Sequence, residues 1–111
     1  MTGTEREAAK QNVFREVNER VVEVHGAMNA QEAPDSLLEI FCECGRSQCA
    51  ERIELTRAEY ERVRAHATHF ALARGHETAL VDHVVERTDR YVVVENQGRA
   101  AELARAADPR A

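Results

Sequence analysis

The stretch IFCECGRSQCAERIEL (residues 40–55) holds all three cysteines of this 111-residue chain, within eight residues of one another. On either side of the turn GRSQ, apolar and β-favouring residues predict strands over residues 37–44 and 49–55. Cys42 and Cys44 are two positions apart, so on a strand both side chains point to the same face. Cys49 returns across the turn, and the sequence therefore predicts a hairpin with three thiols at its tip.

Three clustered thiols are one ligand short of the tetrahedral site that Zn²⁺ prefers, in which imidazole nitrogen often joins thiolate sulfur. His76 is the first candidate for the fourth ligand, because it follows Gly75 at a chain reversal where the backbone is free to turn. His66 and His69, near the end of a predicted helix, are alternative ligands, and a water or carboxylate oxygen is another. We predict one zinc ion per chain, bound by Cys42, Cys44, Cys49 and His76.

Other uses of the same thiols stay open. Buried cysteine is commonly inert, Cys44 and Cys49 could form a redox pair, and clustered thiolates also bind iron–sulfur clusters. The N-terminal segment MTGTEREAAKQN has no signal-peptide pattern, and no apolar run approaches the roughly 18 residues of a membrane span. The chain is therefore expected to be cytoplasmic, where clustered cysteines more often bind metal than form disulfides.

The composition favours one domain and argues against a nucleic-acid partner. The chain has 15 basic and 20 acidic side chains, a formal charge of -5, and no basic patch. Because phosphate neutralisation supplies most non-specific affinity for nucleic acid, binding to it is not expected. No membrane contact is expected either, and apolar residues at 43% are enough for one small core.

The remaining patterns predict an α+β fold. It has a long N-terminal helix over residues 4–28, two β-hairpins plus a short strand with a capped helix between them, and a C-terminal helix over residues 99–107. Thr56 and Glu59 form a T-x-x-E capping box at the start of the middle helix. The short strand covers residues 69–73, and the second hairpin pairs residues 80–86 with 91–95. We expect residues 1–30, an amphipathic helix, and residues 36–111, a zinc-binding α+β domain, to form one structural unit.

The N-terminal helix carries an apolar stripe whose members are spaced by three and four residues, as on one face of a helix: Phe14, Val17, Val21, Val24 and Met28. Coiled coils use the same alternation. The stripe spans only about two heptads, and Val13 and Val22 widen it, which favours docking of the helix on its own domain. A homodimer seam or a contact with another protein is the alternative.

A longer string, FCECGRSQCAERIELTRAEYERVR, followed by HFALARGHE, a VVER strand and a terminal DPR, resembles a group of small actinobacterial proteins of unassigned function. Their motif reads F-x-C-E-C-G, a third cysteine, E-R-I-E-L-T-x-x-E-Y-E-x-V-R and P-G-H-E, after a helix containing F-R-E-V-N-E-R. This chain departs from it at Phe41, which directly precedes the first cysteine, and at Arg74, which replaces the proline. The resemblance supports His76 as a ligand and implies no activity.

These features favour a regulatory or protein-interaction module with a structural Cys3His zinc site. A thiol-based redox or zinc sensor is one alternative. A metal-dependent hydrolase with an open zinc position is another, with Glu43 or Glu77 as the general acid or base. We favour a non-enzymatic role, because three sulfur ligands make zinc a weak Lewis acid and the chain lacks a phosphate-binding glycine loop and an H-E-x-x-H motif.

Overall fold

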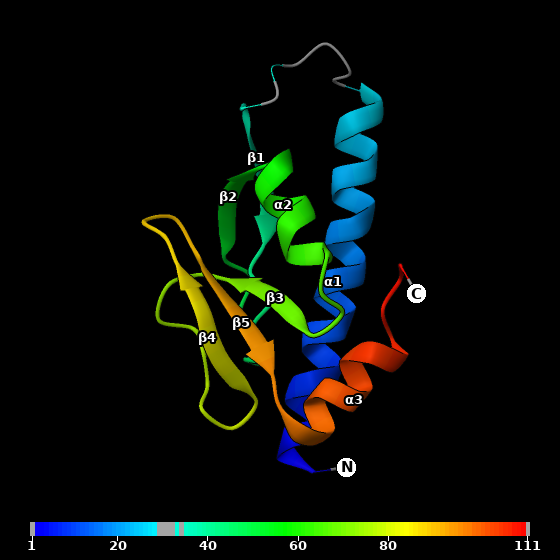
Figure 1. Cartoon of the computed structure of the whole chain (residues 1–111), viewed down its shortest axis with the longest axis vertical. Coiled ribbons are helices and arrows are strands. Elements are labelled where there is room, and N and C mark those ends of the chain that lie inside the picture. Colours follow the sequence, from blue (N-terminus) through cyan, green and yellow to red (C-terminus); the bar gives the residue numbers. More distant parts are fainter. Residues whose placement is uncertain (1, 29–32, 34, 111) are drawn as a thin grey trace.

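The computed structural model describes residues 2–28, 33 and 35–110. Over these residues the chain has the predicted α+β fold and the predicted order of elements (Figure 1). The predicted break after the first helix falls largely on residues 29–32 and 34, which lie outside the described part. The elements are α1 (Gly3–Met28), β1 (Leu37–Phe41), β2 (Arg52–Thr56), α2 (Arg57–Arg64), β3 (His69–Leu72), β4 (Asp82–Arg87), β5 (Val92–Asn96) and α3 (Gly98–Ala106).

The strands form two antiparallel sheets. β1 and β2 pair from Leu37 opposite Thr56 to Phe41 opposite Arg52, and the second sheet has the order β3-β5-β4. Both predicted hairpins are therefore confirmed. The sequence did not indicate that β3 pairs along the far side of β5, which makes β5 the central strand. The end of β3 lies beside the segment that follows β1, where the Glu43 amide donates to the Ala71 carbonyl (Figure 1).

The capping box at α2 is confirmed. The hydroxyl of Thr56 accepts from the Glu59 amide at 3.1 Å, and the Thr56 amide donates to Glu59 Oε1 at 2.8 Å. The carboxylate of Glu59 also accepts two hydrogen bonds from Arg90, at 3.0 and 2.7 Å. One glutamate therefore satisfies the start of α2 and ties that helix to the turn between β4 and β5.

α1 docks on its own domain through only part of its predicted apolar stripe. Its buried residues are Ala8, Gln11, Arg15, Asn18 and Val22. Of the stripe, Phe14 packs edge-on against Phe41, with ring centroids 5.8 Å apart, and Val21 contacts the core. The remaining stripe residues, together with Val13, are exposed; we call this set the outer face of α1: Val13, Val17, Val24 and Met28.

Polar side chains explain why the other face docks. Arg15 is buried, donates to the carbonyls of Ala67 and Ala104, and lies over the Phe70 ring, 4.8 Å from its centroid. Since Ala104 is in the last turn of α3, a cation there satisfies a free helix carbonyl. Hydrogen bonds of this kind fix the orientation of α1 on the domain. They cannot be predicted from the spacing of apolar residues.

The core is shared between the elements. One apolar cluster lies between β1, β2, α1 and α2, and a second includes Cys42, Cys44 and residues of β3, β5 and α3. Cys42 and Cys44 are therefore part of the packed interior, and Cys49 lies partly buried beside them. Among the described residues, none of the helices combines the length and apolar character that crossing a bilayer requires.

Candidate metal centre

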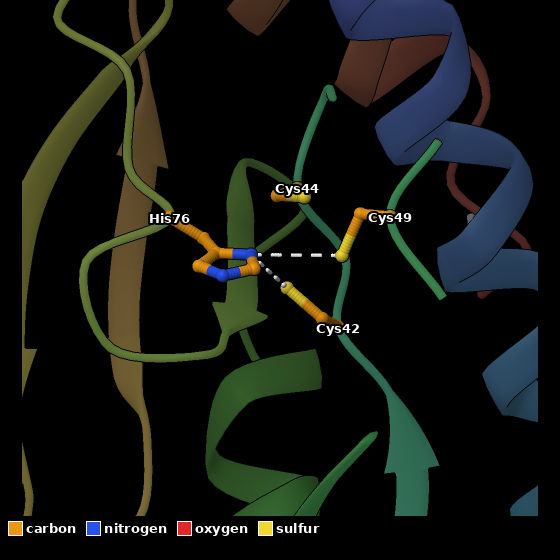
Figure 2. A group of neighbouring side chains, drawn as sticks. All are labelled: Cys42, Cys44, Cys49 and His76. Atoms are coloured by element: carbon orange, nitrogen blue, oxygen red, sulfur yellow. Dashed lines mark hydrogen bonds between the residues drawn. The ribbon is translucent and has the colours of Figure 1, made fainter. Parts of the chain in front are cut away.

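The structure brings four side chains with metal-binding atoms into one group. Their ligand atoms, three sulfur atoms and one ring nitrogen, all lie within 4.8 Å of one another. Figure 2 shows the side chains directed toward a common space. Nδ1 of the histidine lies 3.6 Å from Cys42 Sγ and 3.5 Å from Cys49 Sγ. This is a Cys3His group that could hold one metal ion, formed by Cys42, Cys44, Cys49 and His76.

The cysteines lie beyond the paired strands rather than within them, because the chain changes its hydrogen-bond partner here. The Cys42 amide still donates to the carbonyl of Glu51, next to β2, at 2.8 Å. The next amide, that of Glu43, donates instead to Ala71 of β3 at 2.9 Å. The predicted strands over residues 37–44 and 49–55 are therefore too long toward the turn, and Cys44 and Cys49 stand in irregular backbone between the two sheets.

Two glycines permit this arrangement for different reasons. Gly75 has a φ of +83°, a left-handed conformation that side chains other than glycine adopt at a cost, and it turns the chain just before His76. Gly45 follows the second cysteine, and a Cβ there would lie 2.7 Å from Cβ of Glu7 in α1. α1 therefore packs against the cysteine turn closely enough to require a residue without a side chain.

Backbone and thiol hydrogen bonds favour negative charge on the sulfur atoms. The amide of Ala73 donates to Cys42 Sγ at 3.1 Å. Hydrogen bonds donated by the Cys42 thiol and, to a lesser extent, by the Arg46 amide lower the pKa of Cys44 to about 4. The hydrogen bond from Cys42 to Cys44, together with burial, raises the pKa of Cys42. The group therefore holds one thiolate readily, and a cation would favour loss of the remaining protons, since thiolates are the form that binds metals.

The second ring nitrogen of His76 has a partner of its own. Nε2 lies 2.5 Å from Oε2 of Glu51, while Nδ1 is the nitrogen that faces the sulfur atoms. With a proton on Nε2, the imidazole donates to the carboxylate and presents the lone pair of Nδ1 to the site. Carboxylates in this position fix the tautomer and orientation of metal-binding histidines.

Glu43 lies between two of the cysteines in the sequence and is fully buried. Its Oε1 accepts from Arg64 Nη2 at 2.8 Å and from the Ala71 amide at 2.9 Å, and its Oε2 accepts from Asn18 Nδ2 at 2.8 Å. Both oxygens of Glu43, a candidate general acid or base in the sequence, are therefore occupied by donors in the interior. Glu43 is an internal anchor that joins the cysteine segment to α1, α2 and β3.

Asn18 adds a second connection to the same segment. Its side-chain amide donates to the Phe41 carbonyl at 2.8 Å and its oxygen accepts from the Phe41 amide at 2.9 Å. The side chain thus pairs with the end of β1 as a neighbouring strand would. The position of the first cysteine, one residue later, is fixed from the α1 side as well as from β2.

The alternative histidine ligands lie elsewhere. His66 and His69 stack on each other with ring centroids 4.3 Å apart, and His69 Nε2 lies 3.3 Å from Glu95 Oε2. Burial lowers the pKa of His69, so its neutral form is favoured. Neither belongs to the Cys3His group. Glu77, the other candidate acid or base, lies 3.4 Å from Arg87 Nη1 and is outside the group too.

A cavity of about 540 Å³ opens on one side of the site. Cys49 and His76 line it, whereas Cys42 and Cys44 do not and are 2% and 0% exposed. The rest of its wall comes from the polar turn between the cysteines and from the segment that leads into β2: Arg46, Ser47, Gln48, Ala50 and Glu51. The site is closed on the core side and accessible on this one.

Three residues that build the site were not among those predicted from the sequence: Asn18, Glu51 and Arg64. Nothing in their spacing marked them, since they belong to ordinary amphipathic or alternating patterns and meet the site only through the tertiary fold. A signal was available for Glu43. A charge placed between two residues predicted to be buried needs a partner if it is buried too, and Arg64 provides one.

We expect removal of the Glu51 carboxylate by Glu51→Ala to weaken metal binding about tenfold, the lower end of the range for such carboxylates, because this side chain is largely exposed. Competition with a chelator of known affinity measures the change. Glu54→Ala, an exposed glutamate on the same side of the turn in the sequence, makes the same change in charge and should leave affinity within twofold. Equal effects of the two substitutions would contradict the role of Glu51.

The chain was compared with known proteins at the level of family, sequence and structure. No family model matches it, and neither curated protein sequences nor solved structures give a significant match. The resemblance to small actinobacterial proteins stays a prediction, and the function has to be argued from the geometry of the Cys3His group.

Proposed function

We propose that this chain binds one zinc ion through Cys42, Cys44, Cys49 and His76, and that the ion stabilises a regulatory or protein-interaction module. The observation that carries the proposal is the convergence of four ligand atoms within 4.8 Å from three separate segments of the chain. The segments are the end of β1, the turn before β2 and the loop after β3. An ion at this point joins the two sheets through bonds that a small core cannot supply.

The donor set favours zinc and a structural role. Three thiolates and one imidazole complete a tetrahedron, which is the usual closed arrangement of structural zinc. A catalytic zinc needs a position for water or substrate, and these four donors leave none in that geometry. The nearby carboxylates are also occupied, Glu43 by Arg64 and Glu51 by His76. We therefore favour a structural zinc site over a metal-dependent hydrolase.

Elemental analysis of protein purified without a metal-affinity tag tests the proposal. The parent is expected to contain about one zinc per chain, and Cys49→Ser and His76→Ala should lose most of it. His69→Ala removes a histidine that lies outside the group, and it should keep the full zinc content. A parent without metal would overturn the site. Iron in place of zinc, visible as absorbance from iron–thiolate bonds, would overturn the identity of the ion.

The outer face of α1 supports the second part of the proposal, the contact with another chain. Val17 and Val24 lie seven residues apart on the side of the helix away from Arg15 and Val22, and both are exposed. The helix has 26 residues, a length of about 39 Å at 1.5 Å per residue. An exposed apolar stripe with coiled-coil spacing suits the same stripe on another helix. We propose a second copy of this chain as the partner.

Sedimentation equilibrium tests the pairing. The parent is expected to have the mass of a dimer, and Val17→Glu should shift it to the monomer by placing a charge in the contact. Val85→Glu makes the same change on exposed β4 and should leave the dimer intact. Val21 is unsuitable for this test because it packs against the core of its own chain. A monomeric parent at high micromolar concentration would contradict the homodimer.

A further inference from the structure

The four metal-binding residues are not equally protected. Cys42 and Cys44 are buried in an apolar cluster with residues of β3, β5 and α3. Cys49 is only partly buried and lines the cavity of about 540 Å³ beside the site. A water molecule occupies roughly 30 Å³ of liquid, so small solutes can enter this space beside Cys49.

The wall of the cavity is suited to a small polar reagent. It is formed by the turn from Arg46 to Ala50, by Glu51 and by His76, and all of these residues except Cys49 and Ala50 have polar side chains. In the zinc-bound chain Cys49 is a thiolate, because a coordinated thiol is deprotonated. The thiolate is the nucleophilic form of cysteine, and its susceptibility to oxidation follows its exposure.

We propose that Cys49 is the site at which hydroperoxides oxidise this protein, and that its oxidation releases the metal. This inference rests on the proposed zinc site. In the first step the Cys49 thiolate attacks a peroxide oxygen, so that a sulfur–oxygen bond forms and the oxygen–oxygen bond breaks. The sulfur loses two electrons and becomes a sulfenic acid, and the peroxide leaves as an alkoxide or hydroxide.

A second thiolate completes the reaction. Cys42 Sγ and Cys44 Sγ both belong to the group whose ligand atoms lie within 4.8 Å of one another. Attack by either on the Cys49 sulfenic acid forms a disulfide and expels hydroxide. Overall, two thiolates and one peroxide give one disulfide, one hydroxide and one hydroxide or alkoxide. The zinc ion keeps its charge throughout and leaves, because one thiolate and one imidazole remain to hold it.

The order of attack distinguishes this proposal from general oxidation of clustered thiols. The backbone of Ala73 donates to Cys42 Sγ, and that of Arg46 donates to Cys44. Both sulfur atoms are therefore screened by hydrogen bonds as well as by the core. Cys49 lines the cavity, whereas Cys42 and Cys44 do not, so Cys49 should carry the first oxidation product.

The test uses the zinc-loaded full-length chain and substoichiometric hydrogen peroxide. Zinc release is followed with a chromogenic chelator, and sulfenic acid is trapped with dimedone and located by peptide mass spectrometry. We expect the early adduct on Cys49, about one zinc released per peroxide consumed, and a final disulfide that includes Cys49. Dithiothreitol and added zinc should restore the starting metal content.

A pair of matched variants tests access through the cavity. Ala50→Trp places a large side chain in the cavity wall, and Ala106→Trp places the same side chain on an exposed position of α3 that does not line it. With the bulky cumene hydroperoxide, we expect Ala50→Trp to release zinc at least fivefold more slowly than the parent. Ala106→Trp should match the parent.

The outcomes separate this inference from the proposed function. A parent that contains zinc but gives its first adduct on Cys42 or Cys44, or a final Cys42–Cys44 disulfide, overturns the inference and leaves the zinc site standing. The inference is also overturned if zinc stays bound while the peroxide is consumed. An equal rate of zinc release in the two tryptophan variants would overturn it as well. A parent that contains no zinc overturns both.

Discussion

Replacing Glu43 by alanine is expected to lower the free energy of unfolding by about 3–5 kcal/mol, the range for removal of one partner from a buried ion pair. The side chain of Arg64 is 1% exposed, so its charge would stay in the interior without a counter-ion. The Ala71 amide loses its acceptor as well, and Asn18 Nδ2 loses one of its two acceptors. Unpaired buried groups carry their full desolvation penalty, and for this reason the effect should be large.

Urea unfolding at saturating zinc measures the change. Glu39→Ala is the control, because Glu39 and Arg52 form an ion pair whose side chains are 55% and 60% exposed. Pairs of this kind contribute roughly 0–1 kcal/mol. Glu43→Leu combined with Arg64→Leu removes both charges and should recover part of the loss relative to Glu43→Ala. If Glu43→Ala destabilised the chain no more than Glu39→Ala, the carboxylate would not be the anchor described above.

Removing the metal is expected to lower the thermal midpoint of unfolding by about 10 °C or more. An ion that binds only the folded chain stabilises it by about 2.7 kcal/mol at a free concentration 100 times its Kd. For a chain of this size, 1 kcal/mol corresponds to roughly 4 °C in the midpoint. The loss of stability should be greatest where the metal ligands join the two sheets. The capping box of α2 should keep its hydrogen bonds.

Thermal unfolding in buffers of fixed free zinc measures this effect. The thermal midpoint of the parent should rise with each tenfold increase in free zinc above Kd, because each such increase adds about 1.4 kcal/mol to the free energy of unfolding. The midpoint of His76→Ala should depend less strongly on free zinc than that of the parent, and the midpoint of His69→Ala should depend on it as strongly. A midpoint that does not respond to chelation or to added zinc would mean that the group, whatever it binds, does not stabilise the fold.

Local patterns in the sequence were sufficient for most of the secondary structure. The T-x-x-E box located the start of α2, because its two hydrogen bonds involve residues three apart. The valine-rich runs located β4 and β5, and turn residues separated them. The two strands next to the cysteines were predicted to extend too far toward the turn. At Glu43 the backbone changes its hydrogen-bond partner from β2 to β3, and this contact joins segments far apart in the chain.

The candidate site was predictable in its chemistry and less so in its surroundings. Clustered thiols and a histidine after a glycine are local features, and all four predicted ligands do lie in one group. Glu51, Asn18 and Arg64 were not predictable, because each acts through a neighbour that only the fold supplies. The docked face of α1 was predicted only in part for a related reason. Phe14, Val21 and Val22 do pack against the domain, but buried polar contacts such as those of Arg15 leave no apolar spacing in the sequence.

By itself, then, the sequence determined the order of helices and strands and the kind of atoms available to a metal, because both depend on residues a few positions apart. Only the tertiary structure decided that His76 rather than His66 or His69 meets the cysteines. It also decided that Glu43 points into a network with Arg64, and that Cys49, rather than Cys42 or Cys44, lines the cavity beside the site. These are matters of distance in space, set by how the loop after β3 and the face of α1 pack against the cysteine turn.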